Sequence, residues 1–318
     1  MAKKIAVIGS NMVDLISYVE RMPVKGETLE APSFEMGCGG KGANQAVAAA
    51  KLGSAVLMVS KVGDDIFGDN TIRNFASFGI DTRHVEKVPG TSSGVAPIFV
   101  EPSGENSILI IKGANGHLTP ADIDRAADDL KGCSLIILQL EVPLETVYYA
   151  IAFGHRHGIE TLLNPAPAAP GLDPEKVSKV TYLVPNETEL ALLSNMPVGS
   201  PEQAETAARS LIAKGIRTVI VTLGSKGALL VTADRTARID PVPVTPKDTT
   251  GAGDAFIGAF AHFYMTGGDL MAALNRAAAY AALSITRPGT QKSYATAEEF
   301  AAFGQSRNTG HGMGVSTT

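Results

Sequence analysis

Short apolar runs alternate with longer amphipathic stretches along most of the chain. Runs such as 5–9 and 135–138 are apolar over four or five residues, as buried strands are. This pattern predicts strands at 5–9, 55–60, 135–140, 160–164, 182–184, 218–222 and 228–231, and helices at 43–52, 69–78, 144–157, 187–193, 202–214, 254–265 and 269–285. The alternation predicts an α/β fold with a doubly wound, mostly parallel sheet flanked by helices.

Four other stretches are too short and too polar for the central sheet. They cover residues 14–20, 28–36, 94–100 and 106–112. The last two flank a Ser-Gly-Glu turn at 103–105 and read as a hairpin. We therefore expect a small β-sheet lid formed by about 14–36 and 94–112.

The length of 318 residues and the 45% hydrophobic content fit one large α/β unit. We place one large domain at residues 1–306, with the lid inside it. Residues 307–318 are polar, rich in glycine and without periodicity, so we expect a disordered tail there.

Charge and cysteine content narrow the class of protein. Lys and Arg (27) against Asp and Glu (32) give a net charge of −5, and no long basic run occurs, which argues against nucleic acid as a partner. Two cysteines, Cys38 and Cys133, fit a reducing compartment better than a disulfide framework. Neither a signal-peptide core nor a run of about 20 apolar residues is present. We expect a soluble cytoplasmic protein that does not bind membranes.

The strongest chemical signal is the stretch Asp248-Thr249-Thr250-Gly251-Ala252-Gly253-Asp254. A helical apolar face follows it, so the Gly-Ala-Gly turn marks a helix N-terminus. Unpaired backbone N–H groups and the helix dipole make such a terminus an anion site. Asp254 then stands as a base beside the anion, the layout expected for phosphoryl transfer to a hydroxyl. The alternative is a carboxylate that only satisfies orphan N–H groups.

A second glycine-rich stretch, Gly37-Cys38-Gly39-Gly40-Lys41-Gly42, matches the letters of a dinucleotide-binding motif. That motif follows the first strand directly, whereas here the predicted lid intervenes, which disfavours an NAD(P) enzyme. Glu35 and Gly42 also break the Walker A pattern. Lys41 and Asn44 carry groups suited to sugar hydroxyls; the alternative is a glycine-rich helix entry with unusual backbone angles.

Polar clusters also follow most of the predicted strands. They are 11–14, Glu141, Asn164, 185–189, 222–227 and 248–254. Ligands of open parallel α/β sheets bind at this edge, so the clusters predict one shared site there.

Four of these motifs occur in the order found in one known family. They are Gly39-Gly40-Lys41-Gly42-Ala43-Asn44-Gln45-Ala46, Pro185-Asn186-Glu187-Thr188-Glu189, Thr222-Leu223-Gly224-Ser225-Lys226-Gly227 and the 248–254 stretch. Over about residues 4–303 the chain resembles a ribokinase-type sugar kinase of the large carbohydrate and purine kinase family.

The resemblance implies a role for each matched position. Asp254 would be the catalytic base, and Gly251, Ala252 and Gly253 the anion hole. The implied sugar-binding residues are Met12, Asp14, Gly40, Lys41, Asn44, Glu141 and Asp254. The implied nucleotide-binding residues are Asn186, Thr222, Gly224, Lys226, Gly227 and Gly253. For Glu141 and Asn186 a helix-capping or surface role is the alternative.

The resemblance also implies metal ions and a partner. Asn186 and Glu189 would organise Mg²⁺ through water for bound ATP. A monovalent cation, K⁺, would be held mostly by backbone carbonyls at Asp248, Thr250, Ser284, Arg287, Gly289 and Ser293, although Asp248 alone also fits a turn-forming role. The family often dimerises through the lid, which implies a homodimer.

One departure from the ribokinase pattern bears on the substrate. Ribokinases usually carry asparagine at the position of Met12, where it bonds ribose hydroxyls. A thioether is only a weak acceptor, so a ribose 2-hydroxyl buried against it would lose about 1–3 kcal/mol, whereas 2-deoxyribose has only hydrogens there. The run through Glu30-Ala31-Pro32 also resembles the deoxyribokinase branch.

The sequence therefore predicts ATP-dependent phosphorylation of 2-deoxy-D-ribose at O5, with ribose a poorer substrate. The main alternative is a ribokinase. A nucleoside kinase would need aromatic stacking near the lid, where only Tyr18, Phe34 and Phe99 are available. A non-catalytic sugar-binding protein would not need Asp254.

Overall fold

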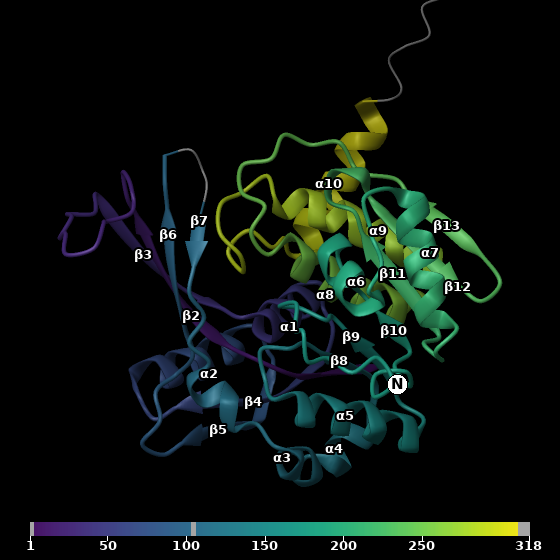
Figure 1. Ribbon diagram of the computed structural model, residues 1–318, viewed down its shortest axis with the longest axis horizontal. Helices are drawn as coiled ribbons and strands as arrows, with labels where there is room; N and C mark the ends of the chain where they lie inside the picture. Colours follow the sequence, from purple (N-terminus) through teal and green to yellow (C-terminus); the bar gives the residue numbers. More distant parts are fainter. Residues whose placement is uncertain (1–2, 103–105, 311–318) are drawn as a thin grey trace, which may run out of the picture.

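A nine-stranded sheet forms the centre of the protein (Figure 1). The computed structural model describes residues 3–102 and 106–310. The strand order is β13-β12-β11-β10-β9-β8-β1-β4-β5; the strands from β11 to β5 are parallel, and β12 and β13 are antiparallel additions at one edge. The strands are β1 (Lys4–Ile8), β4 (Val56–Gly63), β5 (Asp81–Val88), β8 (Cys133–Leu138), β9 (Glu160–Leu163), β10 (Tyr182–Leu183), β11 (Thr218–Thr222), β12 (Ala228–Thr232) and β13 (Thr236–Ile239).

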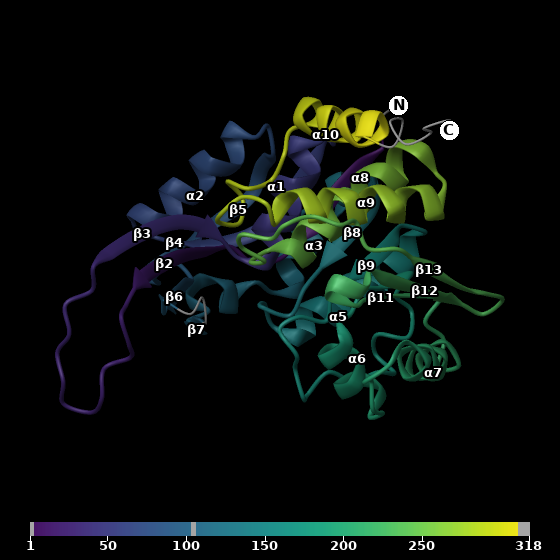
Figure 2. The same cartoon turned by 90° about the horizontal axis from the view of Figure 1, so that it is seen from above.

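Helices cover both faces of this sheet, as the view in Figure 2 shows. One face carries α1 (Lys41–Lys51), α2 (Ile66–Ser77), α8 (Ala252–Gly267), α9 (Leu270–Ser284) and α10 (Ala297–Gly310). The other carries α3 (Pro120–Arg125), α4 (Ala127–Lys131), α5 (Leu144–His157), α6 (Glu187–Ser194) and α7 (Pro201–Ile212). Strand β1 shows why two layers form: Ile5 and Val7 pack into one core and Ala6 and Ile8 into the other, because side chains alternate along a strand.

A second sheet extends away from the main body in both views (Figures 1 and 2). Its order is β3 (Ser33–Gly39), β2 (Met12–Tyr18), β6 (Val95–Val100) and β7 (Asn106–Ile108). Strand β2 begins four residues after β1 ends, so the small sheet starts at the carboxyl edge of the large one. Several of its apolar side chains are exposed, among them Phe34 and Met36.

The predicted doubly wound sheet and the small β-sheet are confirmed. The pattern missed strands β5 and β13 and the helices α3, α4 and α10. Strand β5 is an edge strand in which only Val85 is buried, so it lacks an apolar run. Helix α10 contacts the core mainly through Phe300 and Phe303, which is too little for a clear periodicity.

The predicted start of the tail needs correction at its first residues. Helix α10 runs to Gly310, so the expected tail at 307–310 is helical, and 311–318 lie outside the described residues. The expected turn at 103–105 also lies outside them. Within the described part of the chain, no helix is both long and apolar enough to span a membrane.

Candidate active site

A cavity of about 280 Å³ opens at the carboxyl edge of the parallel sheet. Asn164 follows β9, Val184 follows β10 and Thr222 ends β11, so three neighbouring strands supply one wall. The lining residues are Lys41, Asn164, Ala166, Val184, Asn186, Glu189, Thr222, Thr249, Gly251, Ala252, Gly253, Asp254 and Ile257. The structure thus brings together most of the polar clusters that the sequence placed at this edge.

The N-terminus of α8 forms the opposite wall. Gly251 is its N-cap, with φ of 74°, a left-handed conformation that favours glycine. The Tyr294 hydroxyl donates to the Gly251 carbonyl (3.0 Å), which fixes the turn. Glycine has no side chain with which to cap this helix. The Ala252 N–H donates to the Thr249 carbonyl (3.3 Å), whereas within residues 3–102 and 106–310 the N–H groups of Gly251 and Gly253 have no acceptor, so these two are available to an anion.

Asp254 lies in the first turn of α8 and is 6% exposed. Its Oδ2 accepts a hydrogen bond from Asn44 Nδ2 (3.0 Å), and its Oδ1 accepts one from Gln45 Nε2 (2.9 Å). Both donors are side chains of α1. The carboxylate is therefore held by α1 instead of capping its own helix, which argues against the purely capping alternative.

The close approach of α1 and α8 depends on Gly258. This residue lies one turn after Asp254, and a Cβ built on it would be 2.5 Å from the Gln45 carbonyl oxygen and 2.6 Å from Ala48 Cβ. Only glycine fits there without a shift of one helix. The same contact brings Asn44 and Gln45 within reach of Asp254.

Lys41 is the first residue of α1, and its side chain lines the cavity. Burial by itself lowers the pKa of Lys41, but the carboxylates of Asp254, Glu141 and Glu189 outweigh it and raise the pKa above its usual value. Among residues 3–102 and 106–310, none forms an ion pair with this ammonium group. A protonated lysine without a paired carboxylate is suited to a phosphate.

Asp14, in β2, is partly buried at the junction between the two sheets. Burial, and then the charges of Glu141 and Asp254, raise the pKa of Asp14 from 3.8 to about 7. Gly39 lies directly against its carboxylate, where a Cβ would collide. The structure therefore gathers carboxylates from β2, the loop after β8 and α8 around one small region.

Glu141 is 5% exposed and stabilises the start of α1. Its Oε2 accepts hydrogen bonds from Ser10 Oγ (2.5 Å) and from the Lys41 backbone N–H (2.9 Å). Ser10 Oγ in turn accepts from the Gly42 N–H (3.2 Å). Glu141 thus uses one carboxylate oxygen to hold the start of α1.

Asn186 and Glu189 form a capping box at the start of α6. Asn186 Oδ1 accepts from the Glu189 N–H (2.8 Å), and Glu189 Oε2 accepts from the Asn186 N–H (2.9 Å). Both residues also line the cavity. Burial raises the pKa of Glu189; the Lys41 charge acts in the opposite direction.

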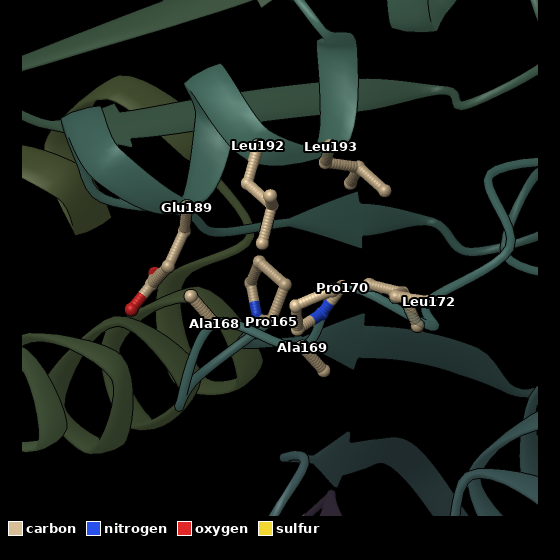
Figure 3. Close-up of a pocket in the computed structure, with 8 residues that line it drawn as sticks. All are labelled: Pro165, Ala168, Ala169, Pro170, Leu172, Glu189, Leu192 and Leu193. Atoms are coloured by element: carbon tan, nitrogen blue, oxygen red, sulfur yellow. The ribbon is translucent and has the colours of Figure 1, made fainter.

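Glu189 also borders a second hollow of only about 20 Å³ (Figure 3). Its other lining residues are Pro165, Ala168, Ala169, Pro170, Leu172, Leu192 and Leu193. The Glu189 carboxylate lies at the Ala168 end of the hollow, away from Leu172 (Figure 3). This space holds about one water molecule and no substrate.

The 222–227 segment connects β11 to β12. Thr222 lines the cavity, and its N–H donates to the Pro185 carbonyl (2.9 Å), which joins two of the predicted clusters. Gly224 and Gly227 have φ of 55° and 88° and shape the turn. Lys226 pairs with Glu187 (3.2 Å). Gly224, Lys226 and Gly227 do not line the cavity.

The residues expected around a monovalent cation lie in two adjoining loops. Asp248 Oδ1 accepts from the Thr250 N–H (2.9 Å) and Oδ2 from the Gly289 N–H (2.8 Å), so its carboxylate joins the loops before α8 and after α9. Ser284 ends α9, and Arg287 pairs with Glu299 (3.0 Å). In the part of the chain that is described, no three His, Cys, Asp or Glu side chains are grouped to hold a metal.

Met12 begins β2 and is 2% exposed. Its Sδ lies 3.6 Å from Asn115 Nδ2, and a Cβ on Gly94 would be 2.7 Å from the same sulfur. Gly40 lies close to the Met12 backbone on the other side. Met12 therefore sits at the base of the small sheet, between the glycine-rich segment and the 3₁₀ turn at Gly113–His117.

Comparison with known proteins identifies the class of enzyme. The model of the pfkB family of carbohydrate kinases matches residues 2–297. The chain belongs to the pfkB carbohydrate kinase family. It is 63% identical to a deoxyribokinase of Salmonella typhi over 93% of this chain and 97% of the relative, and 41% identical to a ribokinase of Bacillus subtilis over 93% and 98%.

Solved structures of this family superimpose closely on the chain. An Arabidopsis thaliana ribokinase, complexed with ribose and ATP, has a TM-score of 0.90 at 30% identity and covers 95% of this chain and 99% of its own. A ribokinase of Thermotoga maritima has a TM-score of 0.87 at 36% identity, with the same coverage. The predicted family resemblance and ribokinase-like fold are confirmed.

Sequence reasoning left several residues of this kinase site unassigned. Gln45 belongs to a motif that it quoted, but no role was given to it. Asn115 and Tyr294 lie in loops without a distinctive pattern, and Gln291 contacts Asn44 only because the loop after α9 folds over α1 (3.0 Å). Only Gln45 carried a signal, namely its place beside Asn44 in a glycine-rich helix entry.

For this pfkB kinase we expect Gly258→Ala to lower both stability and activity. The added methyl group overlaps Gln45 and Ala48, so the helices must separate, at a cost of about 1–3 kcal/mol in unfolding free energy. The same shift moves Asp254 away from its amide donors. Thermal unfolding and kcat measure the two effects.

Gly304→Ala in α10 is the matched control, because a Cβ there meets no atom within 4 Å. It should stabilise the protein by about 0.5–1 kcal/mol and leave kcat unchanged. Unaltered kcat in Gly258→Ala would show that the α1–α8 spacing does not matter for the site.

Proposed function

We propose that this chain is a deoxyribokinase, which transfers the γ-phosphoryl group of ATP to the 5-hydroxyl of 2-deoxy-D-ribose. The products are 2-deoxy-D-ribose 5-phosphate and ADP, and ribose is a poorer substrate. The observation that carries the proposal is the 63% identity to a deoxyribokinase over 93% of the chain, against 41% to a ribokinase over the same share. The ribokinase alternative rests on the 41% identity.

In the proposed reaction Asp254 accepts the proton of the sugar 5-hydroxyl. The O5 atom forms a bond to the γ-phosphorus as the bond from that phosphorus to the β,γ-bridging oxygen breaks, and ADP leaves. The transferred phosphoryl group lies at the α8 N-terminus, against the N–H groups of Gly251, Ala252 and Gly253. The free ammonium of Lys41 compensates charge in the same cavity.

The sugar lies between the small sheet and α1. Asp14, Asn44 and Glu141 offer oxygen and amide groups to its hydroxyls, the backbone at Gly40 comes close to it, and Met12 faces the 2-position. Asn44 also bonds Asp254 (3.0 Å), so sugar and base share a contact. The small sheet then acts as the lid over this end of the site.

The nucleotide lies along the ends of β10 and β11. Thr222 and Asn186 line the cavity there, and Gly224, Lys226 and Gly227 form the turn at its border. The carboxylate of Glu189 and the amide oxygen of Asn186 suit Mg²⁺, a hard cation that keeps several waters; their bonds to each other favour contact through those waters. When bound, the ion would supply positive charge that neutralises the phosphates.

A K⁺ ion is proposed for the loops joined by Asp248. Both oxygens of this carboxylate already accept N–H groups of Thr250 and Gly289. The protein ligands of the ion would then be backbone carbonyl oxygens of the two loops. Such oxygens are suitable ligands for a hard monovalent cation. Activity in K⁺ compared with activity in tetramethylammonium tests this site.

A spectrophotometric assay of ADP release tests the proposed function. We expect kcat/KM with 2-deoxyribose to exceed that with ribose by about 10- to 100-fold. Adenosine serves as the nucleoside comparison and should give no turnover. A higher kcat/KM with ribose would establish the ribokinase alternative.

The pH dependence of sugar binding should follow Asp14. Its pKa of about 7 leaves the carboxyl protonated below neutrality, when it no longer accepts two hydroxyl donors. We expect the KM for the sugar to rise several-fold between pH 8 and pH 6, with a smaller change in kcat. In Asp14→Asn this rise should be absent, at a higher KM throughout.

Stability provides a second readout of Asp14. Its folded pKa lies above the ordinary value, so between about pH 4 and pH 7 the native state binds more protons and stability falls as pH rises. Asp14→Asn removes this penalty. The variant should exceed the wild type by roughly 1–3 kcal/mol at pH 8 and match it at pH 4. Equal stability at both pH values would contradict the raised pKa.

We also propose a cytoplasmic homodimer formed through the lid. Exposed apolar side chains of the small sheet and its loops support the interface. They include Met22, Val24, Leu29, Phe34, Met36 and Ile108. Light scattering should give twice the chain mass, and Phe34→Glu should give the monomer.

A further inference from the structure

Two chains of side-chain amides converge on the Asp254 carboxylate, one on each oxygen. On one side Gln139 Nε2 donates to Gln45 Oε1 (2.7 Å), and Gln45 Nε2 donates to Asp254 Oδ1 (2.9 Å). On the other side Gln291 Nε2 donates to Asn44 Oδ1 (3.0 Å), and Asn44 Nδ2 donates to Asp254 Oδ2 (3.0 Å). The second chain extends outward to α2, where Asn74 Nδ2 donates to Gln291 Oε1 (2.8 Å).

The negative charge at their common end sets the direction of both chains. Gln45 uses both of its N–H groups, on Asp254 and on Asn164 Oδ1 (3.3 Å), and its carbonyl accepts from Gln139. Turned by 180°, Gln45 would place its carbonyl oxygen against a carboxylate oxygen, so two acceptors would face each other. Each amide therefore donates toward Asp254, and aligned buried hydrogen bonds strengthen one another.

The three glutamines of these chains do not line the cavity. Gln45 and Gln139 are fully buried, Gln291 is 5% exposed, and none of them lines the cavity. Gln139 Oε1 also makes no hydrogen bond with any residue in 3–102 or 106–310. A buried acceptor without a partner lowers stability. The Gln139 amide is therefore oriented to donate to Gln45, although this orientation leaves its own oxygen without a hydrogen bond.

A buried base in this environment needs such donors. Asp14 from β2 and Glu189 from α6 are negative neighbours that oppose its charge, and the hydroxyl of Tyr294 is neutral. Lys41 from α1 is the cation that favours the charge. Hydrogen bonds from amides to both oxygens satisfy the buried carboxylate and fix its plane.

We propose that Gln45, backed by Gln139, is a positioning residue that holds the Asp254 carboxylate in place and aimed at the acceptor hydroxyl during phosphoryl transfer. Gln291 does the same through Asn44. The inference rests on the proposed kinase function but does not depend on which sugar is phosphorylated.

Gln45→Met tests the inner donor, because methionine matches glutamine in length and has no N–H group. We expect kcat to fall about 10- to 100-fold with both 2-deoxyribose and ribose, while the KM for sugar and for ATP stays within about twofold. An equal loss on the two sugars separates a role on the base from a role in sugar selection.

Gln139→Met tests the outer donor. A purely structural role would change stability and activity together, whereas the proposed role would not. The substitution removes the hydrogen bond to Gln45 but also the unpartnered Gln139 Oε1. The melting temperature should therefore stay unchanged or rise, while kcat falls about 3- to 10-fold. Thr146→Val is the control: it removes a buried hydrogen bond to the Leu118 carbonyl (2.6 Å) in the core on the other face of the sheet, and should lower the melting temperature without changing kcat.

The inference is overturned if Gln45→Met keeps kcat within twofold of the wild type, or if its whole loss lies in KM. Should Gln45→Met fail to fold, an unchanged kcat in Gln139→Met has the same meaning. If the wild type prefers ribose, only the substrate assignment is rejected. The role of Gln45 is then tested by comparing kcat of the variant and the wild type with ribose. If the wild type turns over neither sugar, a crystal structure of Gln45→Met decides, and an unmoved Asp254 carboxylate refutes the role.

Discussion

The Asp254→Asn variant should lose about 10²–10⁴-fold in kcat, the effect usual for removing a general base. An asparagine keeps the shape of the side chain but cannot take the proton of the 5-hydroxyl. It also presents an amino group to Asn44 or Gln45, both of which already donate, so one amide must turn away. ATP affinity should stay within about twofold, because the glycine turn and Lys41 are untouched. Steady-state kinetics and calorimetry with a non-hydrolysable ATP analogue measure the two quantities.

Asp269→Asn is the matched control for this change. Asp269 likewise begins a helix, as the N-cap of α9, where its carboxylate accepts from the Ala272 N–H (2.6 Å). Asparagine is an equally good N-cap, so kcat and stability should be unchanged. If Asp254→Asn kept more than a tenth of the wild-type kcat, Asp254 would not be the base.

The Met12→Asn variant should shift substrate preference toward ribose by about 10- to 100-fold in the ratio of kcat/KM values. A 2-hydroxyl beside the Met12 thioether loses its water without gaining a strong partner, at about 1–3 kcal/mol. The asparagine amide can bond that hydroxyl. The side chain is 2% exposed and touches Asn115, so the new amide also has a donor nearby. Parallel assays with 2-deoxyribose and ribose give the ratio.

Met36→Asn controls for the substitution itself, since Met36 lies in the same small sheet but is 50% exposed. Its ratio should equal that of the wild type. If the ratio of kcat/KM values in Met12→Asn stayed within twofold of the wild-type ratio, Met12 would not set the sugar selectivity. Asn115 and the backbone at Gly94, which adjoin Met12, would then be the next positions to test.

The sequence was sufficient to predict the two sheets and most of the helices. Strongly apolar runs such as 5–9 and 135–138 indicate burial on both faces, which the centre of a parallel sheet provides. It was not sufficient for β5 or α10, since Val85 in the strand and Phe300 and Phe303 in the helix carry little apolar signal. At such edges tertiary contacts, and not periodicity, decide the element.

The chemistry of the site divides in the same way. A local backbone conformation depends on the residues at that position, so the glycines before Asp254 predicted the turn and the helix N-terminus. Distant contacts are not local: Asp254 and Gln45 are 209 positions apart, and only the packing of α8 on α1 at Gly258 brings them together.

The sequence by itself thus determined the family, the kind of reaction and the acidic residue in the first turn of α8, because each depends on motifs with their own backbone geometry. Only the tertiary structure decided what surrounds that acid. It showed an amide donor on each oxygen of Asp254 and a carboxyl at Asp14 with its pKa raised to about 7 by burial and by like charges. Hydrogen-bond direction and desolvation depend on neighbours in space, which the order of residues does not specify.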